Sequence, residues 1–388
     1  MTTVLIGFAE SLAAVESAWC LADAGYDVVA FTRAGKRPAL AASRYVRVVP
    51  VPAPEDGIEA CVEGLRAVVA HEKPAALLPL DDHSVLLADR LQGVVPIAGP
   101  TGALARIALD KREQLALAEK AGFPVPPTVV LNEGDQPDVP DPHGPWIVKC
   151  ALATVVDDDK IRRPGGGIAR TVPNVADLFS GIAAPSLIQP VIDGAGEGLF
   201  GIAIGGLAFA LSAHQRIRMM NPRGSGSSAA RSIPVDPELA DAARRFVETS
   251  GWHGIFMLEF LRDRTGRPWF MELNGRTWGS MALARHRGWP YPVWAVKSAI
   301  DPDWVPDVPP EGPHRRVRHL GREIVHLLAV LRGPRGADKG RWPTRRSTVV
   351  AMLRPERGTR WYHWRRGEFR VLLRDTWSTV MGQVRKGS

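Results

Sequence analysis

The stretch FMLEFLRDRTGRPWFMELNGR, residues 256–276, contains two apolar runs on either side of a turn signal. Residues 263–267 have the composition of a tight turn, so the flanking runs predict an antiparallel pair of strands. Because side chains alternate between the two faces of a strand, Glu272 and Asn274 share a face. If the strands pair as a hairpin, Glu259 comes beside Glu272, and two carboxylates and an amide oxygen are collected at one place.

Two carboxylates this close together repel each other and are stabilised by a cation. Mg²⁺ prefers oxygen ligands and takes its remaining ligands from water and nucleotide phosphates. Glu259, Glu272 and Asn274 therefore predict a site for Mg²⁺ carried by ATP, with two ions, or Mn²⁺ as an alternative. Arg276 follows directly, and its planar guanidinium suits a phosphoryl group or a carboxylate. The alternatives are solvent-facing glutamates and a surface ion pair at Arg276.

Residues 1–98 predict a Rossmann-like α/β domain with a parallel sheet, because short apolar runs alternate there with helical patterns. Beyond residue 99 the runs are separated by closely spaced turn signals, which predicts antiparallel strands and an α+β arrangement. The expected strands of the first domain are 4–6, 27–31, 46–51 and 75–79, and the expected helices are 11–24 and 58–71.

Phosphate-binding candidates are scattered along the chain. Lys149 ends the apolar run 146–148, and Lys111 lies in a helical segment. The glycines 165–167 form a turn that would let backbone N–H groups approach phosphate oxygens. Each of these is also an ordinary feature of a protein surface. No GxxxxGK[ST] or complete GxGxxG pattern is present, which argues against a P-loop and a dinucleotide fingerprint.

Composition is that of an ordinary globular protein of two or three domains, with 388 residues and a net charge of +8. The three cysteines are far apart, which argues against a disulfide scaffold and a zinc site. The N-terminus lacks the features of a signal peptide, and no apolar stretch is long enough to span a bilayer. We expect a cytoplasmic protein.

The C-terminal part is basic. Residues 301–313 hold five prolines and predict a linker. Residues 314–388 carry many arginines with interleaved tryptophans. One interpretation is a helical extension packed on the catalytic body, and the other is contact with an anionic surface or polymer.

The order of these features resembles the ATP-grasp superfamily, in its carboxylate–amine ligase and carbamoyl-phosphate-synthetase-like branch. The resemblance covers residues 1–300 and rests on the sequence of Asp110-Lys111, Lys149, the glycine run, residues 189–192, Glu197, Glu259 and the Glu272-Leu273-Asn274 motif. It implies a pre-ATP-grasp domain at 1–98, a two-lobed ATP-grasp domain at 99–300 and an extension at 301–388.

The resemblance also implies residue roles and a reaction. Lys111 and Lys149 would contact phosphates, the hinge residues Gln189, Val191 and Ile192 would meet adenine, Glu197 would bind ribose, and Gly166 would lie in a flexible lid. Arg276 would face the γ-phosphate, and Arg216 and Arg231 are further candidates for orienting the reacting groups. The expected activity is an ADP-forming ligase that activates a carboxylate as an acyl phosphate and passes it to an amine or related nucleophile. The alternatives are an inactive nucleotide-binding regulatory protein and a kinase that stops at the phosphorylated product. The oligomeric state stays open.

Overall fold

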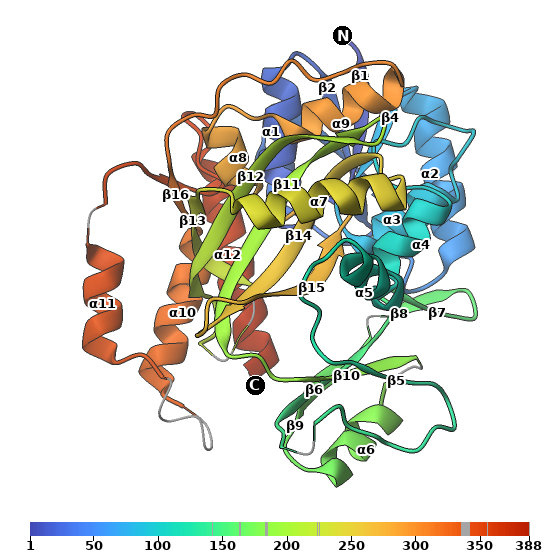
Figure 1. Ribbon diagram of the computed structural model, residues 1–388. Helices are drawn as coiled ribbons and strands as arrows, with labels where there is room; N and C mark the ends of the chain where they lie inside the picture. Colours follow the sequence, from blue (N-terminus) through green and yellow to red (C-terminus); the bar gives the residue numbers. More distant parts are fainter. Residues whose placement is uncertain are drawn as a thin grey trace.

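The computed structural model describes residues 1–141, 143–162, 164–182, 185–222, 224, 226–334, 342–354 and 356–387. Its N-terminal part is a four-stranded parallel sheet with helices on both faces (Figure 1). The strand order is β3 (Val46–Val51), β2 (Asp27–Arg33), β1 (Thr3–Gly7) and β4 (Ala76–Pro79). The helical segments of this part are α1 (Ala14–Asp23), η1 (Ala39–Ala42), α2 (Ile58–Glu72) and α3 (Asp82–Asp89).

The central strand β1 is apolar throughout its middle because both faces of the sheet are covered. Val4 and Ile6 pack in one core with α1 and α9 (Tyr291–Ile300), and Leu5 packs on the other side with α2. The first of these cores continues into the large sheet through Phe200 and Met257. The parallel sheet and the large sheet are therefore joined by one apolar interior.

The large sheet has seven strands, and its order is β15-β14-β11-β12-β13-β16-β17. Every neighbouring pair is antiparallel except β16 with β17. Helix α7 (Pro237–Ser250) begins at the N-cap Asp236 and packs its apolar side on the sheet. The strands are β11 (Gly194–Ile204), β12 (Leu207–Met219), β13 (Ser227–Ile233), β14 (Gly254–Asp263), β15 (Pro268–Asn274), β16 (Arg316–Arg318) and β17 (Thr359–Trp361).

The small sheet forms a separate lobe, which lies below the large sheet in Figure 1. Its antiparallel strands are ordered β5 (Val129–Leu131), β10 (Ser186–Pro190), β6 (Trp146–Cys150) and β9 (Gly166–Ala169). Helix α6 (Val172–Ser180) shares its core. The other elements between the N-terminal part and the large sheet are α4 (Ala103–Leu109), α5 (Lys111–Lys120), β7 (Val155–Asp157) and β8 (Lys160–Arg162).

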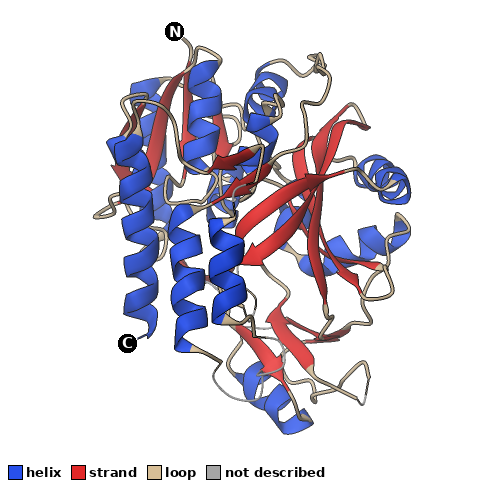
Figure 2. Ribbon diagram, turned by 90° about the vertical axis from the view of Figure 1, so that its left-hand side faces the viewer, coloured by secondary structure: helices blue, strands red, loops and turns tan. Residues whose placement is uncertain are grey.

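The C-terminal helices stand side by side next to the sheets (Figure 2). Asp375 and Val371 of α12 (Phe369–Gly387) face inward, and α12 also contacts η1 of the N-terminal part. The other helices after the large sheet's β15 are α8 (Met281–His286), α10 (Leu320–Arg332) and α11 (Arg345–Leu353). The α/β and α+β fold class with a helical C-terminal part is confirmed.

Several arginines of the C-terminal part have carboxylate partners within the protein. Arg318 contacts Glu323 at 2.6 Å, and Arg365 contacts Asp23 of the N-terminal part at 2.8 Å. Because these arginines form ion pairs within the protein, the structure does not support the predicted contact with an anionic surface or polymer. Among the described residues, no helix has the length and apolar character needed to cross a membrane.

Candidate active site

The paired strands β14 and β15 bring the predicted acidic residues together. Glu259 lies opposite Glu272, and Met257 lies opposite Asn274. The Asn274 amide nitrogen donates to the Glu259 carboxylate at 3.4 Å. An irregularity in the register next to Glu259 places Phe270 opposite Phe260, in the apolar core on the other face of the sheet. Two carboxylates can therefore face a polar space while the same two strands contribute large side chains to the core.

Burial and the nearby Glu272 raise the pKa of Glu259, and Arg216 opposes the rise. Arg216 of β12 donates a short hydrogen bond to the Glu259 carboxylate. The Glu259 side chain is 19% exposed, so the guanidinium is a major source of positive charge for a largely buried acid. Two acids at one place, with Arg216 hydrogen-bonded to one of them, attract further positive charge.

Lys149 of the small lobe lies near Glu272, and Lys111 at the α4–α5 junction lies near Lys149. Burial lowers the pKa of Lys149 to about 8, and the interaction with Glu272 opposes that fall. Lys111 lies close enough to lower the pKa of Lys149 further. The backbone N–H of Lys111 donates to the Ala151 carbonyl at 2.8 Å, directly after β6. That bond explains why two lysines far apart in the sequence lie close together.

Arg276 is held by the N-terminal part. Its guanidinium contacts both carboxylate oxygens of Asp82, at 2.8 and 3.2 Å. Burial would raise the pKa of Asp82, but Arg276 and Lys111 hold it below its ordinary value. Asp82 is the first residue of α3, the helix that follows β4. The N-terminal part therefore fixes the position of Arg276, which follows the end of β15.

A cavity of about 450 Å³, here called the cleft, is lined by Glu259, Glu272, Asn274, Arg216 and Arg276. Its floor is the paired acids of β14 and β15 and the side chain of Arg216 from β12. Its other walls include residues 10–13 after β1, Arg322 of α10 and Tyr362 after β17. The cleft is thus built from the N-terminal part, the large sheet and the C-terminal part together.

Gly166 does not lie in a loop, as the glycine run predicts, but in strand β9. It pairs with Lys149, and a Cβ added there would lie 3.0 Å from the Val148 carbonyl oxygen. The glycine is needed because two strands approach closely at this point. Residues 155–162, between Lys149 and Gly166, form the β7–β8 hairpin, whose Asp159 carbonyl accepts a 2.6 Å hydrogen bond from the Ile58 N–H of the N-terminal part.

Arg231 and Glu197 lie on the opposite face of the large sheet from Glu259. Arg231 donates to the Gln215 side chain at 2.7 Å, and Gln215 pairs with Glu197 across the strands. Arg262 donates to the Glu197 carboxylate at 2.9 Å. The candidate role of Arg231 beside the reacting groups is therefore wrong, because alternation along β13 points its side chain away from the cleft. Glu197 is already engaged in an ion pair.

The predicted hinge connects β10 of the small lobe to β11 of the large sheet. Gln189 is buried, and its side-chain amide donates to Thr128 at 2.8 Å. The backbone N–H of Val191 donates to the Pro145 carbonyl at 2.9 Å. The Val191 amide is thus used inside the small lobe, and Ile192 follows it in the link between the lobes.

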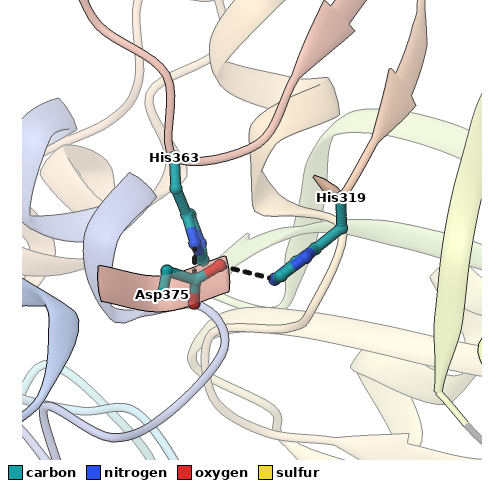
Figure 3. A group of neighbouring side chains, drawn as sticks. All are labelled: His319, His363 and Asp375. Carbon is teal, nitrogen blue, oxygen red and sulfur yellow. Dashed lines mark ion pairs between the residues drawn. The ribbon is translucent and has the colours of Figure 1, made fainter. Parts of the chain in front are cut away.

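A buried cluster of His319, His363 and Asp375 lies next to the cleft (Figure 3). The two imidazoles each contact a different oxygen of Asp375 at 3.2 Å. Nδ1 of His319 accepts the Arg322 N–H, so its Nε2 carries the proton toward Asp375. Nε2 of His363 faces the Leu12 carbonyl at 3.2 Å, which only a protonated nitrogen can contact favourably.

The pKa values agree with this assignment of protons. Burial lowers the pKa of His319 to about 3, which keeps it neutral. Burial also disfavours charge on His363, but Asp375 raises its pKa above the ordinary value. Although the three groups lie close enough to hold a metal ion, the ion-pair contacts of both imidazoles with Asp375 account for their arrangement. The cluster ties α12 to the start of α10 and to the loop after β1.

Several cleft residues were not anticipated, and some of them had a signal in the sequence. Glu10 follows β1, Arg33 ends β2, and Asp81 follows β4. The carboxyl ends of parallel strands meet at one edge of a sheet, so polar residues just after the predicted strands could have been grouped. Arg322 and Tyr362 had no such signal, because they reach the cleft through the packing of the C-terminal part.

Comparison with known proteins agrees with this architecture. Residues 210–322 match a family described as ATP-grasp in the biosynthetic pathway with Ter operon. No curated protein sequence matches the chain. Among solved structures, the L-amino acid ligase from Bacillus licheniformis is similar with a TM-score of 0.58 and 16% identity, over 78% of this chain and 74% of that one.

Two further solved structures are similar over most of their length. N5-carboxyaminoimidazole synthetase from Staphylococcus aureus has a TM-score of 0.61 and 15% identity, over 83% of both chains. The biotin carboxylase domain of Hydrogenobacter thermophilus 2-oxoglutarate carboxylase, in complex with MgADP, ADP and bicarbonate, has a TM-score of 0.59 and 14% identity, over 77% and 70%. The chain therefore has the ATP-grasp fold, and the resemblance to that superfamily is confirmed.

Proposed function

We propose that this chain is an ATP- and Mg²⁺-dependent ligase that activates a carboxylate as an acyl phosphate and transfers it to an amine or related nucleophile. The observation that carries the proposal is the pairing of Glu259 with Glu272, next to Asn274, in a cleft that two lysines approach. A phosphate chain with its cations supplies the charges that complete such a site.

The donor set fits a hard divalent cation. Glu259 and Glu272 offer carboxylate oxygens from adjacent strands, and Asn274 offers an amide oxygen on the same face. Burial raises the pKa of Glu259, and the neighbouring Glu272 raises it further, so an added cation would stabilise the charged pair. Mg²⁺ bound there would neutralise phosphate oxygens as negative charge moves toward the leaving ADP. We infer two ions, with Mn²⁺ able to replace Mg²⁺.

Nucleotide contacts follow from the same geometry. Lys111 and Lys149 would bind phosphate oxygens; in support, Lys149 lies near Glu272 and Lys111 lies near Lys149. Adenine would meet the hinge at the Val191 carbonyl and at Ile192, since the Val191 amide is already used. Glu197 is not assigned to ribose, because it lies on the opposite face of the sheet from the acids and its carboxylate is paired with Arg262.

The chemistry needs positioning and neutralised charge more than an acid or a base. An oxygen of the substrate carboxylate attacks the γ-phosphorus, and the bond to the bridging oxygen breaks with its electron pair on ADP. The amine then attacks the acyl carbon, phosphate leaves with the electrons of the C–O bond, and the amine loses a proton. Arg276, fixed by Asp82, and Arg216 are the arginines placed to offset charge at the transferring group.

The solved structures with this fold support the proposal, because they include a ligase for amino acids and a carboxylase domain in complex with MgADP and bicarbonate. We also propose the division of the chain into a pre-ATP-grasp domain at 1–98, an ATP-grasp domain at 99–300 and a C-terminal extension at 301–388. The extension would complete the cleft through Arg322 and Tyr362.

The test is ADP release by the purified protein with Mg²⁺, ATP, and panels of carboxylic acids and amines. We expect ADP only when an acid is present, and a hydroxamate when hydroxylamine replaces the amine. The Glu272→Gln variant should lose this turnover, whereas Arg231→Met, on the opposite face, should keep it. Nucleotide binding without turnover of any acid would favour the regulatory alternative. A stable phosphorylated product in place of a hydroxamate would favour a kinase.

A further inference from the structure

One arginine of the cleft has no carboxylate partner. Arg322 lies in the first turn of α10, and no acidic group of a described residue is within ion-pair distance of its guanidinium. The other arginines that line the cleft are paired: Arg33 with Glu55, Arg216 with Glu259 and Arg276 with Asp82. Arg322 is therefore the cleft arginine with no ion-pair partner among the described residues; Asp375, which interacts with it at longer range, is already paired with His319 and His363.

The position of Arg322 is fixed by short contacts with the start of β13. Its Nη1 donates to the Ser227 carbonyl at 3.0 Å. A Cβ added to Gly226 would lie 2.5 Å from the same nitrogen, so a side chain there would displace the guanidinium. Burial lowers the pKa of Arg322, and the interactions with Tyr362 and Asp375 only partly oppose that fall. The guanidinium is thus held in place, and only part of its donor capacity is used.

Arg322 also separates the cleft from a second cavity of about 430 Å³. The loop residues Glu10, Ser11 and Leu12 line both spaces, as Arg322 does. The other walls of the second cavity come from residues 36–39, including Lys36 and Arg37, and from α12, including Asp375 and Ser378. The two cavities are therefore neighbours across one arginine, and a molecule that contacts Arg322 could extend into either.

Tyr362 supplies a second donor near this arginine. Its side chain is 6% exposed and lines the cleft, and its hydroxyl has no hydrogen-bond partner among the described residues. Burial raises the pKa of Tyr362, so the hydroxyl keeps its proton. Arg322 and Tyr362 interact electrostatically, which places both donors in one region of the cleft.

We propose that Arg322, with the Tyr362 hydroxyl, binds the carboxylate of the acid substrate, and that the rest of a polar acid occupies the second cavity. This inference rests on the proposed function, because it assigns the acid to the same cleft. A planar guanidinium is matched to the two oxygens of a carboxylate, and here it is the unpaired cation of the cleft. The basic C-terminal part then has a specific role, which is to select the acid rather than to bind a polymer.

Chemical labelling tests the proposal without any turnover. Phenylglyoxal should modify Arg322 at least about tenfold faster than the paired Arg216 and Arg276, because ion pairing and charge-assisted hydrogen bonds protect a guanidinium. Peptide mass spectrometry measures the rates. Polar acids from a panel of the twenty common amino acids, malate and succinate should slow the modification of Arg322, while chloride at equal ionic strength should not. Equal labelling of the three arginines, or no protection by any acid of the panel, would overturn the proposal.

Binding and kinetics of variants supply the second arm. For an acid that protects Arg322, we expect Arg322→Met to weaken its binding, or raise its KM, roughly 10- to 100-fold. The affinity for MgADP should stay within about twofold, and Arg322→Lys should restore part of the loss. The matched control is Arg231→Met, on the other face of the sheet. An unchanged affinity for the acid in Arg322→Met overturns the assignment even if ligase activity is found, and loss of MgADP binding alone would count against the proposed function instead.

Discussion

Replacing Lys149 by methionine should stabilise the protein when no nucleotide or metal is bound. Burial lowers the pKa of Lys149 from its ordinary value of 10.5 to about 8, so folding works against its charge. Methionine is similarly long and unbranched, and it fills the same space without a charge. A lysine kept for phosphate binding at the expense of stability would behave in this way.

The size of the effect follows from the shift in pKa. Each pKa unit corresponds to about 1.4 kcal/mol, so the charged form of Lys149 costs up to about 3 kcal/mol at neutral pH. Between pH 8 and 10.5 the unfolded chain holds a proton that the folded protein has lost, so the free energy of unfolding rises with pH. The gain from Lys149→Met should therefore be largest at pH 7 and should shrink toward zero as the pH approaches 10.5.

Urea titrations at pH 7 and pH 9.5, with and without MgADP, measure this prediction. Without nucleotide, the variant should be more stable at pH 7, and MgADP should stabilise it less than it stabilises the wild type. Lys120→Met, an exposed position at the end of α5, should show neither effect. A variant that is no more stable than the wild type at pH 7, or whose gain does not change with pH, would refute the reasoning about Lys149.

Three further predictions concern the packing behind the cleft. Gly275→Ala would place a Cβ 2.6 Å from the Trp252 ring and should lower the free energy of unfolding by about 1–3 kcal/mol in urea; an unchanged value would contradict the close packing. Leu258→Ala, at a fully buried position beside the acids, should cost about 2–5 kcal/mol in the same assay, and a cost below that of an exposed leucine would be inconsistent with its burial. Although burial opposes it, Asp375 raises the pKa of His363, so stability from this pair is present below the unfolded pKa of about 6.5 and is lost as the pH rises through the folded value. Asp375→Asn should therefore lower the thermal midpoint more at pH 6 than at pH 9, and an equal drop at both would count against the charged pair.

The acidic pair could be predicted because the information is local. Glu259 and Glu272 are joined by one short turn, so alternation and hairpin pairing were enough to place them together. The parallel sheet was also predictable, since each buried strand carries a continuous apolar run. The sequence pattern did not predict the irregularity in strand register. Because of it, Phe270 packs in the core although Glu272, two residues later, faces the cleft.

Residues brought together by distant packing could not be placed. Arg276 and Asp82 are 194 positions apart, and nothing near either residue indicates the other. For Gly166 the local sequence was misleading. Its glycine-rich surroundings predicted a loop, but the residue lies in a strand and pairs with Lys149. Arg231 was misjudged because the face of a strand depends on register with neighbours that were not yet known.

The central claim is that Glu259, Glu272 and Asn274 hold the cations of a bound nucleotide. A crystal structure with Mn²⁺ and a non-hydrolysable ATP analogue tests it most directly, because Mn²⁺ scatters anomalously and replaces Mg²⁺ at oxygen sites. The account predicts anomalous peaks at about 2.0–2.3 Å from the oxygens of these side chains, and their loss in Glu272→Gln. Peaks elsewhere, for example at His319, His363 and Asp375, with the acidic pair free of metal, would contradict it.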